Sequence, residues 1–236
     1  MGDTFTCPFC GSRFRKMLAG GSRESVWDQY NVVAGGWREN VYCPECYSTD
    51  KERLLMFYLS EVVRLPLSSA RFSVLHIAPE THLGPFLAGL KNLTYVSGDI
   101  NPGRAMVVLD ITQLPLPDCS QDIVICSHVL EHVVRDEVAL GEIYRVLRPG
   151  GFAILQVPFS SQLQEDLEDT TATSWEDRER VFGQGDHVRL YSLHEYRAKI
   201  EGAGFTVQEY YATSSPNSAR YAVNPREPVF ICSRES

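Results

Sequence analysis

Several features are absent from this 236-residue sequence or scarce in it, and each excludes a class of protein. No window approaches the ~18 consecutive apolar residues of a membrane-spanning helix, and the polar start MGDTFTCPFCGSRF lacks the apolar core of a signal peptide. Basic residues are too few to hold nucleic acid by charge alone, because 22 Lys and Arg face 30 Asp and Glu, a net charge of -8. Repeats and low-complexity segments are also missing, and 44 % hydrophobic residues exclude disorder as the main description. We therefore expect a cytoplasmic globular protein with no membrane partner.

Four of the seven cysteines stand in two C-x-x-C pairs. Cys7 and Cys10 lie in CPFCG, and Cys43 and Cys46 lie in CPEC. In a reducing compartment, pairs at this spacing are typical of metal ligands rather than of disulfides. Four thiolates complete the tetrahedral shell of a structural Zn²⁺ and leave no open position. The alternatives are two unrelated cysteine pairs or a redox motif.

The 32 residues between the two pairs exceed the usual spacing of about 15–20 in a zinc ribbon. We therefore expect residues 15–42 to form an excursion from the ribbon. Its aromatic residues form either the core of a small zinc module or an apolar wall near a substrate; they are Trp27, Tyr30 and Trp37. After the second pair, the spacing of apolar residues over 51–65 predicts a helix. Pro66 then ends the first of two expected domains, residues 1–66.

From Arg71 onward, short apolar runs alternate with segments of helical spacing, which predicts an α/β domain over residues 67–236. The expected strands are Phe72–Ile77, Thr94–Asp99, Met106–Asp110, Asp122–Cys126, Phe152–Val157, Thr206–Tyr211 and Val229–Cys232. The expected helices are Leu83–Leu90, Asp136–Leu147 and Ser192–Ala203. Such alternation implies a mostly parallel sheet covered on both faces, with ligands bound at the carboxyl ends of its strands.

Acidic residues end two consecutive predicted strands. Asp99 is well placed to accept two hydroxyl hydrogen bonds from a ribose, because an ionised carboxylate offers two acceptor oxygens. Asp110 can accept from an exocyclic amine, with Ile100 and Ile111 as apolar faces for a purine. Each aspartate alone is more often a helix cap or a solvated turn. Their joint occurrence at consecutive strand ends favours the ligand.

At these residues the sequence resembles a known family, the class I S-adenosylmethionine-dependent methyltransferases of the small-molecule type with an N-terminal zinc ribbon. The resemblance covers nearly the whole chain through CPFCG, CPEC with KERLL, VLHIAPE, SGDINPG, AMVVLDITQLPLPD, DIVICSHVLEHV, EIYRVLRPGGFAILQVP and GDHVRLYS. It implies a Rossmann-like seven-stranded sheet whose last strand is antiparallel. It also implies that Asp99 holds the cofactor ribose, that Asp110 and Ile111 hold the adenine, and that Ser127 and His128 lie near the methionine portion.

The loop after the first α/β strand departs from the superfamily pattern. Most members have a glycine-rich loop there, but this chain has His76-Ile77-Ala78-Pro79-Glu80 and no glycine before Gly84. Ala78 must then allow the close approach of the cofactor, and Glu80 can accept from its ammonium group. The alternative is a degenerate pocket in a protein that only binds or regulates.

Two histidines are candidate general bases for the methyl acceptor. His132 follows Glu131 after the fourth α/β strand, and His187 precedes the helix that starts at Ser192. Both have an unperturbed pKa suited to proton removal. The alternative for each is a structural hydrogen-bonding role.

A long polar connection, residues 160–185, lies between a strand and GDHVRLY. It is either a lid over the acceptor or a solvated excursion. With only Arg178 and Arg180 expected nearby, a lid of this composition favours a neutral or cationic acceptor. Its seven carboxylates are Glu165, Asp166, Glu168, Asp169, Glu176, Asp177 and Glu179.

The predicted function is methyl transfer from S-adenosylmethionine to an oxygen or nitrogen of a small molecule such as a natural product. One alternative is an RNA base methyltransferase whose ribbon contacts RNA. The balanced charge of residues 1–70, with eight basic and eight acidic side chains, disfavours it. The other alternative is a non-catalytic, cofactor-binding interaction protein. The sequence predicts neither the acceptor nor the oligomeric state.

Overall fold

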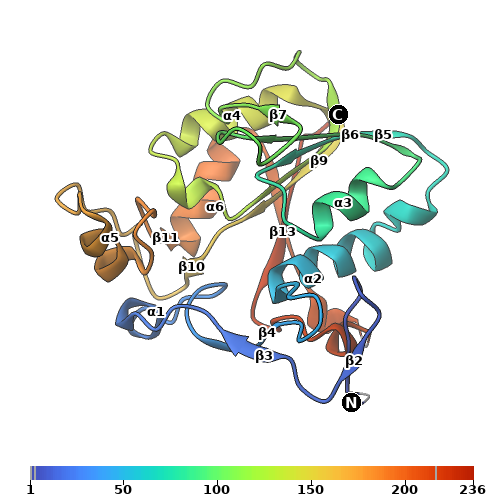
Figure 1. Cartoon of the computed structure of the whole chain (residues 1–236). Helices are drawn as coiled ribbons and strands as arrows, with labels where there is room; N and C mark the ends of the chain where they lie inside the picture. Colours follow the sequence, from blue (N-terminus) through green and yellow to red (C-terminus); the bar gives the residue numbers. More distant parts are fainter. Residues whose placement is uncertain (1, 3, 216) are drawn as a thin grey trace.

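A seven-stranded sheet forms the centre of the protein, with the strand order β12-β13-β9-β8-β5-β6-β7 (Figure 1). The structure is a computed structural model and describes residues 2, 4–215 and 217–236. Strands β5 to β9 pair in parallel, and β13 runs antiparallel to both of its neighbours. This confirms the expected sheet and its antiparallel last strand. Its strands are β5 (Phe72–Ile77), β6 (Leu93–Asp99), β7 (Val107–Val108), β8 (Gln121–Ser127), β9 (Leu147–Gln156), β12 (Thr206–Tyr211) and β13 (Pro228–Ser233).

Strand lengths follow burial. The central strands β5 and β8 are apolar runs covered on both faces, so the sequence predicts them almost to the residue. The expected strand Met106–Asp110 shrinks to the two residues of β7. β7 lies at the edge of the sheet, and Val108 is 58 % exposed there, so little packing supports a longer strand.

Helices cover both faces of the sheet. α4 (Asp136–Val146) and α6 (Leu193–Gly202) pack on the face that carries Leu75 and Ile77. α2 (Asp50–Phe57) and α3 (Leu83–Ala88) pack on the opposite face, which carries Val74. The expected helix over 51–65 is confirmed in its first half and continues as a π-helical turn over Tyr58–Val62. Because α2 contributes to the sheet's core, the hydrophobic core is continuous across residue 66, the expected domain boundary.

The N-terminal module consists of two cysteine turns and a long hairpin. β1 (Phe5–Thr6) pairs with β2 (Arg13–Phe14), and β3 (Leu18–Gly20) pairs with β4 (Arg38–Tyr42). The tip of the hairpin carries α1 (Ser25–Gln29), which lies far from β2 and next to α5 (Trp175–Phe182) in Figure 1. The expected excursion over 15–42 is therefore confirmed.

The connection over 160–185 is partly ordered by pairing with neighbouring elements. β10 (Phe159–Ser160) pairs with β11 (Tyr191–Ser192), and Val33 bridges to Phe159, which ties the hairpin to the sheet domain. The prediction that only two arginines lie near its carboxylates is wrong. Asp166 pairs with Lys199 at 2.8 Å and Glu168 pairs with Arg189 at 2.7 Å, because residues distant in sequence fold against this segment.

Short helical turns complete the chain: Leu65–Leu67, Leu130–His132, Ala212–Ser214 and Ser218–Tyr221. Among the described residues, no helix combines the length and apolar character needed to cross a membrane.

Candidate functional site

The carboxyl ends of β5, β6 and β8 meet at a cavity of about 570 Å³. Six of the eight residues predicted to hold a cofactor line this cavity, which we call the cofactor cavity. They are Ala78, Asp99, Ile100, Asp110, Ile111 and His128. The sequence did not predict three further lining residues, the apolar side chains of Val129, Val133 and Val134. These valines follow β8 in a segment of which only polar residues were predicted to belong to the site.

Asp99 and Asp110 share one local arrangement. Asp99 Oδ1 accepts from the backbone N–H of Asn101 at 2.7 Å, and Asp110 Oδ1 accepts from the N–H of Thr112 at 2.8 Å. Hydrogen bonds from Thr112 hold the pKa of Asp110 below its usual range, so this carboxyl stays ionised near neutral pH. In both residues one oxygen fixes the turn, and the other is left to accept from a ligand. The turn role and the ligand role are therefore compatible.

Two strand ends that line the cavity carry side chains in a backbone conformation that favours glycine. Ala78 follows β5 with φ 47°, and His128 follows β8 with φ 56°. Left-handed conformations in non-glycine residues cost about 1–3 kcal/mol and are often found at functional sites. Ala78 thus adopts a backbone conformation that glycine adopts freely, with only a methyl group as its side chain.

Glu80 and Ser127, the other two predicted residues, lie beside the cavity rather than on its surface. Glu80 Oε2 is 2.7 Å from His76 Nε2, while Oε1 is buried without a hydrogen-bond partner among the described residues. Burial alone would raise the pKa of Glu80, but the charge and hydrogen bond of His76 lower it instead. Ser127 is buried at the end of β8. A carboxylate with one unused, buried oxygen fits a cationic ligand group.

The four paired cysteines converge as the spacing predicts. Their sulfurs all lie within 4.8 Å of one another, with Cys7 and Cys46 at 3.6 Å and Cys10 and Cys43 at 3.7 Å. These distances exceed an S–S bond by far. Four sulfurs at ~2.3 Å from one Zn²⁺ would stand roughly 3.8 Å apart, so the arrangement fits a tetrahedral ion.

A buried charged cluster that the sequence reasoning missed joins the cofactor cavity to the N-terminal module. Lys51 Nζ lies 3.2 Å from His128 Nδ1, which in turn lies 3.2 Å from Glu131 Oε1. Glu227, just before β13, lies 3.8 Å from His128 Nε2. Burial would raise the pKa of Glu131, but its contact with His128 lowers it to about 2. Lys51 belongs to the KERLL motif, whereas no sequence pattern indicated a role for Glu227.

The two candidate bases come together, but in different environments. His132 lines the cofactor cavity, and its Nδ1 is 3.1 Å from the backbone oxygen of Asp186. His187 is fully buried behind it, edge-on to His132 at 4.8 Å and to Trp27 at 6.2 Å between ring centroids. Burial lowers the pKa of His187 to about 4, so its ring is neutral near neutral pH. Of the two histidines, His132 alone lines the cavity.

A second cavity of about 470 Å³ lies between the hairpin and α5. Trp27, Lys51 and Glu179 line it, and Asp186 lines both this cavity and the cofactor cavity. We call it the hairpin cavity. Its position between two segments far apart in sequence explains why the sequence alone could not place it.

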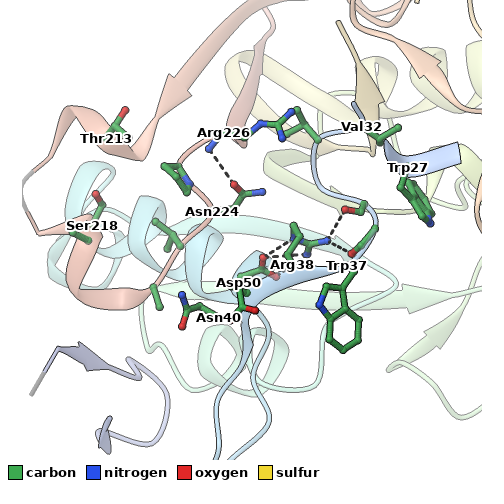
Figure 2. A pocket seen from close by; sticks show the side chains of 18 of the residues that line it. Trp27, Val32, Trp37, Arg38, Asn40, Asp50, Thr213, Ser218, Asn224 and Arg226 are labelled. Atoms are coloured by element: carbon green, nitrogen blue, oxygen red, sulfur yellow. Dashed lines mark hydrogen bonds and ion pairs between the residues drawn. The ribbon is translucent and has the colours of Figure 1, made fainter. Parts of the chain in front are cut away.

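A third cavity of about 700 Å³ borders the hairpin cavity across the Arg38–Asp50 ion pair. Figure 2 shows Arg38 between the Asp50 carboxylate and the backbone oxygens of the loop before Trp37. Asn224 and Arg226 of the segment before β13 line the other side. The ion pair thus stiffens a wall that two cavities share.

Fold and site together define a class of protein. A sheet of this order, with acidic strand ends around a cavity at its carboxyl edge, is the Rossmann-like fold of class I S-adenosylmethionine-dependent methyltransferases. Residues 90–155, which contain β6 to β8 and most of β9, match the family model of the methyltransferase domain. That segment includes Asp99, Asp110 and His128.

Comparison with known proteins agrees with this class. The chain is 30 % identical over 100 residues to a protein of Mycolicibacterium smegmatis named a probable S-adenosylmethionine-dependent methyltransferase, covering 42 % of this chain and 34 % of that protein. It is 33 % identical over 110 residues to the 27-O-demethylrifamycin SV methyltransferase of Amycolatopsis mediterranei, covering 45 % and 37 %. The chain thus spans about a third of the length of these curated relatives.

Among solved structures, the CurJ carbon methyltransferase superposes with a TM-score of 0.52 at 16 % identity, over 78 % of this chain and 54 % of that one. At this identity the likeness establishes the fold alone.

Proposed function

We propose that this chain transfers a methyl group from S-adenosylmethionine to an oxygen or nitrogen of a small molecule. The observation that carries the proposal is the pair Asp99 and Asp110, each with one oxygen fixing a turn and one left for a ligand at the cofactor cavity. A ribose and an adenine amine are donors that suit these two acceptors. The match of residues 90–155 to the methyltransferase domain supports the same ligand.

Each part of the cofactor has a partner on this chain. Asp99 would hold the ribose, and Asp110 with Ile100 and Ile111 would hold the adenine. Glu80 Oε1 would accept from the ammonium group, and the backbone at Ala78, Ser127 and His128 would surround the methionine portion. S-adenosylmethionine supplies an electrophilic methyl group on a sulfonium sulfur. The tasks left to the chain are to place the acceptor on axis and to exclude water.

The hairpin cavity is the site we assign to the methyl acceptor. It borders the cofactor cavity at Asp186, and Lys51 on its wall contacts His128 on the wall of the cofactor cavity. Its mixture of Trp27 and Trp175 with Lys51 and Glu179 suits a small acceptor with an apolar body and a polar group. The relative from Amycolatopsis, named for a small-molecule acceptor, supports this size class.

We further propose that Cys7, Cys10, Cys43 and Cys46 bind one structural Zn²⁺. The ion would stabilise the module from which the hairpin extends. With four sulfur ligands it has no open position for chemistry.

Calorimetry with S-adenosylhomocysteine tests the cofactor assignment. Asp99→Ala is expected to weaken binding roughly 10- to 100-fold, because hydrogen bonds to a charged group contribute about 1.5–3 kcal/mol. Asp169→Ala is a matched control, because Asp169 Oδ1 accepts from Thr171 in the same turn geometry outside the cavity. Equal affinities for the two variants would overturn the assignment of the ribose to Asp99.

A further inference from the structure

We propose that Glu131, His132 and His187 form a second metal site, which binds one divalent cation of the first transition series beside the cofactor cavity. One carboxylate oxygen and one ring nitrogen from each histidine lie within 4.8 Å of one another. A cation with bonds of about 2.1 Å holds neighbouring ligands roughly 3 Å and opposite ligands roughly 4.2 Å apart. Small rotations of the three side chains therefore bring them onto one ion.

Buried polar atoms without partners point to a ligand at this place. Both ring nitrogens of His187 and Oε2 of Glu131 lack hydrogen-bond partners within the described part of the chain. His187 is 0 % and Glu131 1 % exposed. Each buried group left unpaired costs about 1–3 kcal/mol. A cation bound by Glu131 Oε2 and one nitrogen of His187 would satisfy two of the three atoms.

Neighbouring groups orient the ligands as they do in established metal sites. His132 Nδ1 lies 3.1 Å from the backbone oxygen of Asp186, and a carbonyl can only accept, so Nδ1 carries the proton of the neutral ring. The lone pair then lies on Nε2, the nitrogen that we assign to the cation. Glu131 Oε1 lies 3.2 Å from His128, which leaves Oε2 for the cation. Metal-binding histidines and carboxylates are typically held by such outer contacts.

The local charge suits a dication. Three carboxylates surround the site, namely Glu131, Glu227 and Asp186, whose Oδ2 is 3.5 Å from His132. Lys51 is the cation that reaches this cluster, through His128, and the neighbouring Asp50 is neutralised by Arg38. Carboxylates therefore outnumber ammonium and guanidinium groups in this cluster.

Three protein ligands leave coordination positions open. His132 lines the cofactor cavity and Asp186 lines both cavities, so an ion held here would stand where the cofactor and hairpin cavities meet. Two imidazoles and one carboxylate favour Zn²⁺, Fe²⁺, Co²⁺ or Ni²⁺ over Mg²⁺ or Ca²⁺. This part rests on the proposed function: the open positions select an acceptor with an oxygen donor, such as a hydroxyl or a carboxylate, next to the atom that is methylated.

Cobalt titration tests the site. The chain is first loaded with Zn²⁺, and loosely held metal is removed with a weak chelator. Co²⁺ is then added and followed by calorimetry and visible absorption. We expect one further equivalent of metal, with absorption that lacks the thiolate charge-transfer bands of cysteine-bound Co²⁺. That spectrum separates the new site from exchange into the four-cysteine site.

Variants assign the ligands. Glu131→Gln keeps the side-chain volume, and His187→Asn removes the imidazole; each is expected to weaken Co²⁺ binding at least tenfold. His194→Asn is the control, because His194 is an exposed histidine on α6 that lines none of the three cavities. Thermal unfolding reports whether each variant folds. If His187→Asn does not fold, Glu131→Gln decides the question alone.

Two results would overturn the proposal: a total of only one equivalent of bound metal, Zn²⁺ and Co²⁺ counted together, in the unmodified chain, or a second equivalent that a folded Glu131→Gln binds within twofold of the unmodified affinity. S-adenosylhomocysteine binding is measured on the same samples. If the unmodified chain does not bind S-adenosylhomocysteine, the proposed function is wrong. The cobalt stoichiometry does not depend on that result.

Discussion

At the scale of one residue, Ala78 takes the backbone conformation that a glycine would otherwise supply in the loop after β5. Its φ of 47° places a methyl group in a conformation that glycine adopts freely. The backbone is held there by its N–H, which donates to the Gly98 oxygen at 2.8 Å. The strain is thus imposed by the pairing of neighbouring strand ends.

Replacing Ala78 by glycine is expected to raise the free energy of unfolding by roughly 0.5–1 kcal/mol, because the left-handed conformation no longer carries a side-chain penalty. Ala198→Gly, on the exposed face of α6, is expected to lower it by about 1 kcal/mol through helix propensity. Urea unfolding of both variants measures the contrast. Equal destabilisation by the two changes would show that Ala78 is not strained.

The contribution of Glu80 to cofactor binding is expected to be independent of pH near neutrality. Its pKa is lowered by His76 below the ordinary 4.5, so the carboxylate is present at neutral pH and is lost only as pH falls through that lowered value. The ratio of S-adenosylhomocysteine affinities between the unmodified chain and Glu80→Gln is therefore expected to stay constant, at about tenfold, from pH 8 to pH 5.5. Calorimetry at the two pH values tests this. A ratio that collapses between them would mean that Glu80 is protonated in that range, as burial alone would make it.

Arg53 links the N-terminal module to the rest of the chain through a single buried side chain. Its guanidinium donates to five backbone oxygens, those of Asn40, Val41, Ser48, Tyr221 and Ala222. Five N–H groups are all that a guanidinium has, so every donor is used. Burial lowers the pKa of Arg53, and the charges of Asp50 and of the cysteine cluster counteract part of this lowering. The proposed Zn²⁺ held by four thiolates would carry a net charge of -2, and the single positive charge of Arg53 would offset half of it.

At the scale of elements, the contact between α1 and α5 closes the hairpin cavity. Gly183 ends α5 with φ 89°, and a Cβ at that position would overlap the Trp27 ring. The glycine therefore serves both the end of the helix and the close approach of the hairpin.

Gly183→Ala is expected to lower the free energy of unfolding by about 2 kcal/mol and to raise the KM for the acceptor, because the hairpin must move away from α5. S-adenosylhomocysteine affinity is expected to stay within twofold, since the cofactor cavity is lined by other residues. Gly202→Ala is the control, because its Cβ would meet open space. An unchanged acceptor KM in Gly183→Ala would separate the hairpin cavity from acceptor binding.

The two cysteine turns have almost the same backbone. The Gly11 N–H donates to the Cys7 backbone oxygen and the Tyr47 N–H donates to the Cys43 backbone oxygen, both at 2.9 Å, and both donor residues have positive φ. Glycine meets this requirement in the first turn, while Tyr47 adopts it in the second. The apolar cluster of this module is small, so the proposed Zn²⁺ would contribute most of the local stability.

Removal of Zn²⁺ by a strong chelator is expected to speed amide hydrogen exchange in residues 5–14 and 38–49 at least tenfold while β5 and β8 stay protected. The sheet keeps its own core, which includes α2. Hydrogen-exchange mass spectrometry with metal analysis measures both effects, and Cys43→Ser is expected to reproduce them. Loss of protection throughout the chain would show that the metal supports the whole fold.

At the scale of the whole molecule, the proposed acceptor site is assembled from parts distant in sequence. The hairpin supplies Trp27, α2 supplies Lys51, and the segment before β11 supplies Asp186. Most of the acidic residues over 160–185 instead stabilise the fold or face solvent, as the pairs of Asp166 and Glu168 show. The net charge of -8 is therefore a weak guide to the acceptor.

Much of this protein could be predicted from its sequence, because the relevant signals are local. Apolar periodicity gave the strands of the sheet and its helices, and a two-residue spacing paired the cysteines. A strand that ends in aspartate brings that residue to the carboxyl edge of the sheet wherever the neighbouring strands lie. The cofactor cavity therefore contains most of the residues predicted for it.

Only the tertiary structure brought together groups that lack a common sequence pattern. The sequence predicts His132 and His187 as two separate candidate bases and assigns no role to Glu131. The three residues nevertheless converge, because the chain returns past the end of β8 before α6, where the Val188 N–H donates to the Glu131 backbone oxygen. Lys51 and Glu227, and the residues that line the hairpin cavity, are likewise brought together only by the tertiary structure. Periodicity and spacing determine which elements form and what ends them. The packing of distant elements decides which side chains meet, and with them the chemistry of the acceptor site.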